Sequence, residues 1–366
     1  MLAHLVERDI RIVEVRSSSL LHSTIKFKDA KLAFFCGIMV ENGGRMSKFD
    51  DQYIDLCKRI LAQGEQITNY KKADRRSKKV ASAIPDHTAQ GSSAAETIRL
   101  PHQVMQFDLS EEFPILTTKK VGFKTAVLEM LWIYQEASND VRWLQDRGVK
   151  IWDEWEVAED GTYQGRNLNE IFANKHPNEE KEDFAHTIGT AYGWIVNRYD
   201  LIRNLIETLK TNPGNRRMVL SLWQNEWLET AALPSCVWNS QWNLINGKLN
   251  VLVTSRSSDV PLGLPFNVVQ YAVLCHLVAA SVGVKPGQMT FITNDAHIYT
   301  NQIDGIKEQI ERYDEAMAGA GLPKTPKLWL NPEIKDFYEF DNSRELKDIK
   351  LEGYEHLGAI KMPVTE

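Results

Sequence analysis

The clearest structural signal in this chain is the dipeptide Asn246-Gly247, which lies between two largely apolar segments. Asn-Gly is the pair that a tight two-residue β-turn prefers, because both of its residues must adopt positive φ. The segments on either side, 241–245 and 249–253, have the length and composition of β-strands. The sequence therefore predicts an antiparallel β-hairpin at this position.

Other segments carry helical or strand patterns that do not alternate regularly. From Phe49 apolar residues recur at helical spacing up to Gly64, and an apolar helix that includes Glu129 is expected at 124–134. Further expected elements are helices at 201–209 and 266–282 and strands at 218–223 and 289–293. Without regular βαβ alternation or an internal repeat, the pattern favours an α+β fold, with one large, mostly antiparallel mixed sheet covered by helices.

The domain organisation follows from breaks in these patterns. Residues 1–45 show no sustained period and are interpreted as an N-terminal extension, either disordered or not natively translated. Residues 46–366 are expected to form a single domain with a polar insertion at 159–187. The stretch 70–98 is basic at first and then rich in Ala, Ser and Gly, which is typical of a mobile loop.

Charge and cysteine content exclude several classes of protein. Among the 366 residues, Lys and Arg total 43 and Asp and Glu 49, for a formal net charge of −6. This mild acidity argues against a dedicated nucleic-acid surface or an anionic-membrane binder, so an anionic substrate needs a local basic pocket. The four cysteines have no CxxC spacing, which favours free thiols in the cytoplasm. The longest early apolar run, 32–40, is too short to span a bilayer.

A few residues, each weak evidence alone, together imply a definite chemistry. Cys236 precedes the hairpin, and a thiolate nucleophile needs positive charge nearby to lower its pKa. Side chains that can supply this charge and grip a phosphate are Arg216, Arg217 and Arg256. Glu129 in an apolar helix can relay protons, and the amide of Asn267 can read the edge of a pyrimidine. The implied ligand is a nucleotide monophosphate that is attacked by sulfur.

A series of motifs, from Met46 to the C-terminus, resembles the thymidylate synthase family in both content and order. The motifs are FPILTTKK (113–120), IWDEW (151–155), NRR (215–217), LPSC (233–236), RSSD (256–259), LGLPFN (262–267), DAHIY (295–299), GY (353–354) and IKMPV (360–364). So many long motifs in one order make a chance similarity negligible. The resemblance implies a thymidylate-synthase-like fold whose sheets pack back to back in a homodimer.

The resemblance also implies a reaction, the reductive methylation of dUMP to dTMP by a methyltransferase. The expected cosubstrate is 5,10-methylenetetrahydrofolate, which gives both the carbon and the hydride, and no metal is expected. Cys236 is expected to add to C6 of the uracil, with Arg256 activating the thiol. Glu129 and Tyr192 are expected to manage the C4 carbonyl and the C5 proton, and Trp152 to complete the catalytic set.

The binding residues implied by the resemblance fall into two groups. Those expected to bind dUMP are Arg76, Arg216, Arg217, Arg256, Ser257, Asn267, His297 and Tyr299. Within this group the pair 216–217 is expected to reach the phosphate from the partner subunit, which gives shared active sites. Those expected to bind the reduced folate are Lys119, Trp152, Asp259 and Gly263, with Lys119 on the glutamate tail and Asp259 on the pterin.

Three alternatives remain open on sequence alone. A deoxyuridylate hydroxymethylase shares the covalent chemistry but traps the intermediate with water. The charged C-terminal residue Glu366 favours this alternative, whereas Trp152 favours trapping by hydride and so the synthase. A thiol hydrolase pairs Cys236 with His276 or His297, but leaves the arginines and Asn267 without a role. The third alternative is a catalytically silent nucleotide-binding protein.

Overall fold

The computed structural model describes residues 46–68, 96–320 and 326–364. The predicted extension 1–45, Arg76 with most of the predicted basic loop, and Glu366 lie outside these described residues. Contacts divide the chain into Met1–Gly43 and Gly44–Glu366, and all described residues belong to the second unit. The extension and the single domain over 46–366 therefore stay predictions.

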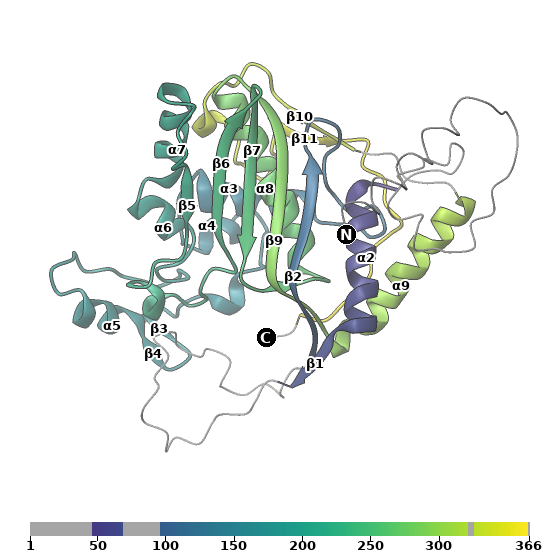
Figure 1. The fold of residues 1–366 in the computed structure, drawn as a ribbon. Helices are drawn as coiled ribbons and strands as arrows, with labels where there is room; N and C mark the ends of the chain where they lie inside the picture. Colours follow the sequence, from purple (N-terminus) through teal and green to yellow (C-terminus); the bar gives the residue numbers. More distant parts are fainter. Residues whose placement is uncertain (1–45, 69–95, 321–325, 365–366) are drawn as a thin grey trace, which may run out of the picture. The chain divides into compact units, whose positions relative to one another are not determined.

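A seven-stranded sheet carries the described fold (Figure 1), with the strand order β1-β2-β9-β7-β6-β5 and β8 paired to β9. Its strands are β1 (Glu65–Thr68), β2 (Glu96–Asp108), β5 (Val219–Ser221), β6 (Val237–Ile245), β7 (Lys248–Ser255), β8 (Ser258–Asp259) and β9 (Lys285–Tyr299). Two smaller sheets pair β3 (Thr162–Tyr163) with β4 (Arg166–Asn167) and β10 (Lys327–Leu330) with β11 (Ile349–Glu352). Because β2 begins at Glu96, the prediction of a loop over 96–98 is wrong.

The hairpin predicted at Asn246-Gly247 is confirmed. Both residues have positive φ, 54° and 70°, and β6 and β7 pair antiparallel on either side of them. The sheet is otherwise antiparallel except that β7 and β8 each run parallel to β9. A mostly antiparallel mixed sheet in an α+β fold is thus confirmed, with one βαβ crossover between β7 and β9 that the sequence patterns did not indicate.

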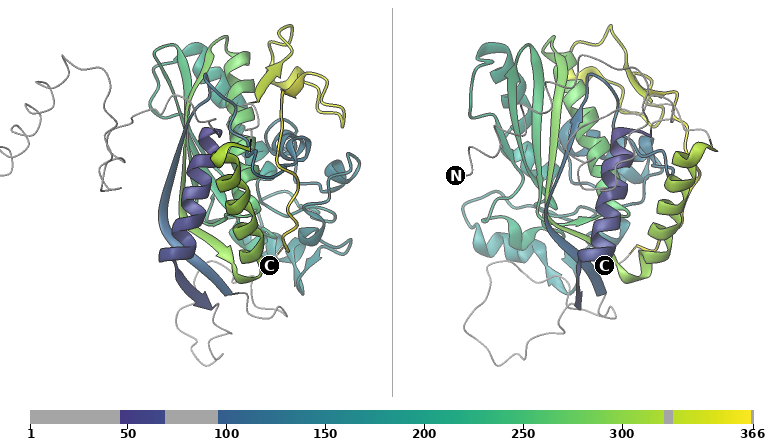
Figure 2. Two further views of the ribbon diagram at one scale, coloured as in Figure 1. Left: turned by 90° about the vertical axis from the view of Figure 1, so that its right-hand side faces the viewer. Right: turned by 45° about the vertical axis from the view of Figure 1, so that its right-hand side comes forward.

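Helices cover one face of the sheet, as the two views of Figure 2 show. The helices are α2 (Lys48–Gln63), α3 (Phe123–Tyr134), α4 (Arg142–Gln145), α5 (Leu168–Lys175), α6 (Gly193–Arg198), α7 (Leu201–Thr211), α8 (Gly263–Ser281) and α9 (Ile303–Glu315). The predicted helices coincide with α2, α3, α7 and α8, and the polar insertion contains β3, β4 and α5. Helix α8 is apolar enough to cross a membrane, but 72% of that apolar stretch is buried, as expected of a core helix.

The buried carboxylate of Asp50 attaches α2 to the FPILTTKK segment. Asp50 has no exposed surface and accepts hydrogen bonds from the backbone N–H and hydroxyl groups of Thr117 and Thr118, at 2.7–3.1 Å. Ser47, which caps α2, donates a further bond of 2.6 Å to the same carboxylate. One side chain therefore satisfies five buried donors and fixes the segment that leads to Lys119.

We predict that Asp50→Ala destabilises the protein by about 3 kcal/mol or more, because several buried donors lose their acceptor at once. The matched control is Asp55→Ala on the exposed side of the same helix, which should change stability by less than about 1 kcal/mol. Urea unfolding followed by circular dichroism measures both. Equal midpoints for the two variants would contradict this account of Asp50.

Candidate active site

The candidate site lies at one edge of the sheet, where β7 and β9 both end. Parallel strands place their carboxyl ends at the same edge, which is where ligands bind in many sheets. Arg256 directly follows β7, and His297 and Tyr299 lie at the carboxyl end of β9. Because β6 is antiparallel to β7 and begins opposite its end, Cys236 comes to the same edge.

Cys236 and Arg256 contact each other directly. The Nη2 of Arg256 is 3.6 Å from the Cys236 sulfur and also donates to the carbonyl oxygen of Pro234 at 2.8 Å, while the Nε donates to the carbonyl oxygen of Ser235 at 3.1 Å. Burial raises the pKa of the Cys236 thiol, and the charge of Arg256 opposes this rise without cancelling it. The sequence predicts a cation beside the thiol, but not that burial outweighs the effect of that cation on the pKa of the thiol.

Tyr192 supports the same cysteine from a strained backbone position. Its φ of 46° and ψ of −105° are rare for a residue with a side chain. The next residue must be glycine, because a Cβ on Gly193 would lie 1.9 Å from the carbonyl oxygen of Ser138. In this conformation the Tyr192 hydroxyl accepts a 3.0 Å bond from the Cys236 N–H, and burial raises its pKa well above the ordinary value. The phenol therefore keeps its proton and can donate it.

Glu129 is a buried carboxyl held by two donors. Its Oε1 accepts a 2.8 Å bond from the indole Nε1 of Trp152, and its Oε2 accepts from the Nε2 of Gln270. Burial raises the pKa of Glu129 to about 7, although both hydrogen bonds act in the opposite direction. A carboxyl with such a pKa exchanges its proton near neutral pH.

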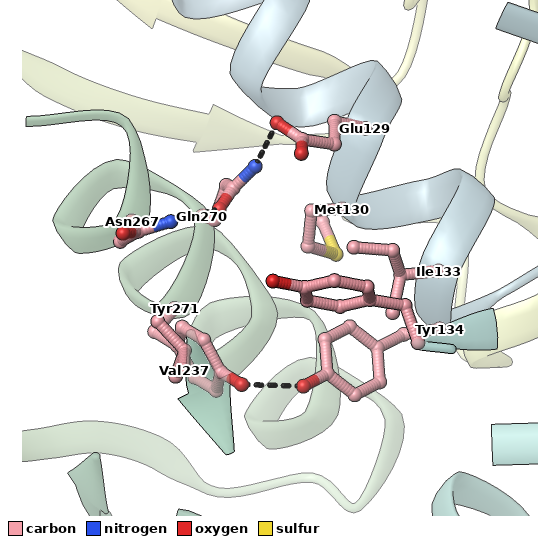
Figure 3. Close-up of a pocket in the computed structure, with 9 residues that line it drawn as sticks. Glu129, Met130, Ile133, Tyr134, Val237, Asn267, Gln270 and Tyr271 are labelled. Carbon is pink, nitrogen blue, oxygen red and sulfur yellow. Dashed lines mark hydrogen bonds between the residues drawn. The ribbon is translucent and has the colours of Figure 1, made fainter. Parts of the chain in front are cut away.

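A small cavity of about 30 Å³ adjoins these groups, with room for about one water molecule. Figure 3 shows Glu129, Asn267 and Gln270 at one end of it. The hydrogen-bonded hydroxyls of Tyr134 and Tyr271 lie at the other end. The Nδ2 of Asn267 donates a 3.1 Å bond to the Oε1 of Gln270, so an unbroken chain of hydrogen bonds links Asn267 to Glu129.

The end of β9 carries a second polar group. The Nδ1 of His297 lies 3.0 Å from Asp295, whose carboxylate also binds Arg99 at 3.1 Å. Burial favours a higher pKa for Asp295, but His297 and Arg99 outweigh it and hold that pKa below its ordinary value. The rings of His297 and Tyr299 meet edge to face at 5.2 Å. Ser257, half-buried, follows Arg256 in the chain.

Beside β9, Asp259 ends β8 opposite His297. Its carboxylate accepts bonds from the Leu262 N–H at 3.0 Å and the Gln302 side chain at 3.3 Å, and burial raises its pKa. Gly263 opens α8, and even a Cβ there would only contact Asp259 at 3.8 Å. Lys119 is buried and donates to the carbonyl oxygen of Pro261, and burial lowers its pKa to about 8.

Two predicted site residues, Arg216 and Arg217, do not lie at this edge in the structure of the described residues. Arg216 and Arg217 are exposed and precede the short strand β5 at the far end of the sheet order. Three residues that were not predicted from the sequence contact the predicted site residues, namely Gln270, Asp295 and Gln302. A signal was available for Gln270, which lies one helical turn after Asn267, and for Asp295, which begins the DAHIY motif. Gln302 gave no such signal.

Comparisons with known proteins agree with this geometry. A profile of the family described as thymidylate synthase matches residues 51–366. The thymidylate synthase of Clostridium beijerinckii is 43% identical over 320 residues, which cover 87% of this chain and 100% of that protein. Thymidylate synthase 1 of Bacillus subtilis is 38% identical over 320 residues, covering 85% of this chain and 96% of that protein.

Among solved structures, thermostable thymidylate synthase A from Bacillus subtilis superposes with a TM-score of 0.66 at 35% sequence identity. The match covers 86% of this chain and 99% of that one. Since the family profile spans most of the sequence and these relatives are matched over nearly their full length, the chain belongs to the thymidylate synthase family.

Proposed function

We propose that this enzyme, a methyltransferase of the thymidylate synthase family, converts dUMP to dTMP through a covalent adduct of Cys236. The observation that carries the proposal is the Cys236 sulfur 3.6 Å from Arg256. Tyr192, which accepts from the Cys236 N–H, lines one cavity with the hydrogen-bonded group of Glu129, Gln270 and Asn267. The family and its named relatives support the overall reaction. Since those relatives are thymidylate synthases, the hydroxymethylase alternative is not favoured.

In the covalent step, the sulfur of Cys236 forms a bond to C6 of the uracil. The electrons of the C5–C6 double bond move toward C5 and the C4 carbonyl, so C5 becomes the nucleophile. Arg256 stabilises the thiolate that begins this step, because its cation is the nearest charge to a thiol whose pKa burial otherwise raises. The same guanidinium is proposed to hold the phosphate, together with Ser257.

Proton movements are assigned to Glu129 and Tyr192. Glu129 can donate toward the C4 carbonyl as charge develops there and take the proton back afterwards, since its pKa is about 7. The Tyr192 phenol, which accepts a hydrogen bond from the Cys236 N–H, is proposed to act on the C5 proton. Asn267 is proposed to bind N3 and O4 of the base, and His297 and Tyr299 the ribose.

The residues proposed for the reduced folate fit that ligand unevenly. When bound, 5,10-methylenetetrahydrofolate supplies the one-carbon unit and the hydride. Asp259 is a half-buried acceptor suited to the N–H groups of a pterin, and Gly263 leaves open space beside it. Trp152 fits less well, because its ring is 6% exposed and packs against the rings of Trp155 and Tyr192. Lys119 also fits less well than Asp259, because its amine is buried and bound to the Pro261 carbonyl rather than presented to an anionic tail.

We also propose a homodimer with shared sites. One face of the sheet bears no helices (Figure 2). Burial alternates along β7 and β9, and the partly exposed Leu252 and Ile292 point to the face opposite their buried neighbours. Packing two such faces back to back buries them. The exposed pair 216–217 is then available to the phosphate site of the partner, and Arg76 is proposed as a further phosphate ligand. A cytoplasmic location, no metal, and no nucleic-acid or membrane partner stay predictions.

We predict that Cys236→Ser binds dUMP with nearly unchanged affinity but loses turnover by several orders of magnitude, because a hydroxyl is a far weaker nucleophile at neutral pH. Calorimetry measures binding, and dihydrofolate absorbance together with mass analysis of the nucleotide measures turnover. The control is Cys275→Ala, a buried cysteine of α8, which should keep its activity. Synthesis of dTMP by Cys236→Ser within about tenfold of the wild type, or 5-hydroxymethyl-dUMP as the wild-type product, would refute the proposal.

We predict that the wild type loses stability relative to Glu129→Gln as pH rises from 5 to 7. Above pH 4.5 the unfolded chain releases the Glu129 proton while the folded protein, with a pKa of about 7, retains it. The difference in unfolding free energy therefore grows by up to about 1.4 kcal/mol per pH unit and then levels off. Urea unfolding at several pH values measures it. Glu352→Gln, at an exposed position, is the control and should give a flat difference.

We predict that shared sites allow complementation between inactive variants. Mixing Cys236→Ser with the double variant Arg216→Ala/Arg217→Ala should restore activity, since one site of each heterodimer then receives an intact cysteine and intact arginines. The control mixes Cys236→Ser with Glu129→Gln, whose defects lie in the same subunit's site and should not complement. No recovery despite proven subunit exchange would place the arginines in their own subunit's site.

A further inference from the structure

Gln270 lies between two proposed site residues and has no role in the mechanism above. It is 5% exposed on α8, one helical turn after Asn267 and opposite Glu129 on α3. Its Nε2 donates to Glu129 and its Oε1 accepts the 3.1 Å bond from Asn267. Figure 3 shows these three side chains in sequence at the end of the cavity.

The direction of these hydrogen bonds is fixed from the Glu129 end. Above its pKa of about 7, the Glu129 carboxyl is ionised and only accepts, so Gln270 must turn its NH2 group toward it, as it does in the structure. The Gln270 oxygen then faces Asn267, which must present its own NH2 group in return. The carbonyl oxygen of Asn267 is left as the end that faces away from Gln270 (Figure 3).

We propose that Gln270 is a positioning residue that sets the orientation of the Asn267 amide and thereby makes the site select uracil over cytosine. This inference rests on the proposed function, in which Asn267 binds the base. Uracil offers an N3–H donor and an O4 acceptor, which match the free oxygen and the second NH2 hydrogen of Asn267. Cytosine offers an N3 acceptor and an amino donor, which match the same amide only after it has flipped.

Flipping Asn267 is costly because of Gln270. A flipped amide turns its carbonyl oxygen toward the Gln270 oxygen, so two buried acceptors face each other without a donor. Flipping Gln270 as well only moves the conflict to the ionised Glu129 carboxylate, which then faces an oxygen; a protonated Glu129 could donate to that oxygen, so the restraint acts above a pH of about 7. The orientation of one amide, rather than its presence alone, therefore carries the discrimination.

The test compares the dissociation constants of dUMP and dCMP by calorimetry, which needs no turnover, at a pH well above 7 where Glu129 is ionised. Gln270→Met keeps the volume of the side chain and removes both hydrogen bonds, so we expect the preference for dUMP to fall by about tenfold or more. The matched control is Gln135→Met, another buried glutamine that bonds to the carbonyl oxygens of Phe337 and Phe340, and its preference should not change. An unchanged preference in Gln270→Met overturns the inference.

A second variant keeps the test informative if the methionine protein is unstable. Gln270→Glu can share one proton with Glu129 and still turn an oxygen toward Asn267, so it should keep the preference for dUMP within about threefold. Loss of the preference in this variant also overturns the inference. Asn267→Asp separates the two proposals. If this variant changes the preference and the Gln270 variants do not, Gln270 does not orient Asn267. If Asn267→Asp leaves the preference unchanged, Asn267 does not bind the base, and the proposed function is wrong on that point.

Discussion

The parallel pairing of β7 with β9 is the constraint on which the candidate site depends. A parallel pair needs a crossover connection, and α8 supplies it. Both strands then end at one edge, where Arg256 leaves β7 and His297 lies near the end of β9. The antiparallel hairpin brings Cys236 to the same edge, and the first turns of α8 add Asn267 and Gln270. One crossover thus collects residues that are far apart in the sequence.

Burial determines the charge of the groups gathered at this edge. It raises the pKa of Cys236, Glu129 and Tyr192 and lowers that of Lys119, so each group is shifted toward its neutral form. Arg256 is the cation in contact with the thiol. Formation of the Cys236 thiolate therefore depends on this contact with Arg256 and on how a bound nucleotide changes the surroundings of the thiol. Glu129, with a pKa of about 7, can already exchange a proton near neutral pH.

Local features of the fold were predictable from the sequence, and long-range ones were not. The turn at 246–247 and the apolar periods of α2, α3 and α7 are properties of a few adjacent residues, and each was located within a few positions. The parallel register of β7 and β9 depends on how α8 packs, which no local pattern encodes. The same division holds in the site. In the sequence, a charged residue such as Glu129 within an apolar helix indicates a functional site, whereas a neutral amide such as Gln270 gives no comparable indication. The dominance of burial at Cys236 also depends on neighbours from several elements.

The strained backbone of Tyr192 explains how the site keeps its geometry before any ligand binds. A residue with these dihedrals costs on the order of 1–3 kcal/mol and persists only where its surroundings fix it. Two contacts do so here. The backbone of Ser138 leaves no room for a side chain at Gly193, and the Cys236 N–H binds the Tyr192 hydroxyl. One end of this restraint is the backbone of the nucleophile, whose carbonyl oxygen also accepts hydrogen bonds from the Arg256 N–H at 2.9 Å and the Ser255 hydroxyl at 3.2 Å. The backbone of Cys236 is therefore bonded at both its N–H and its carbonyl group, and the strained Tyr192 supplies one of the bonds that keep the thiol beside Arg256.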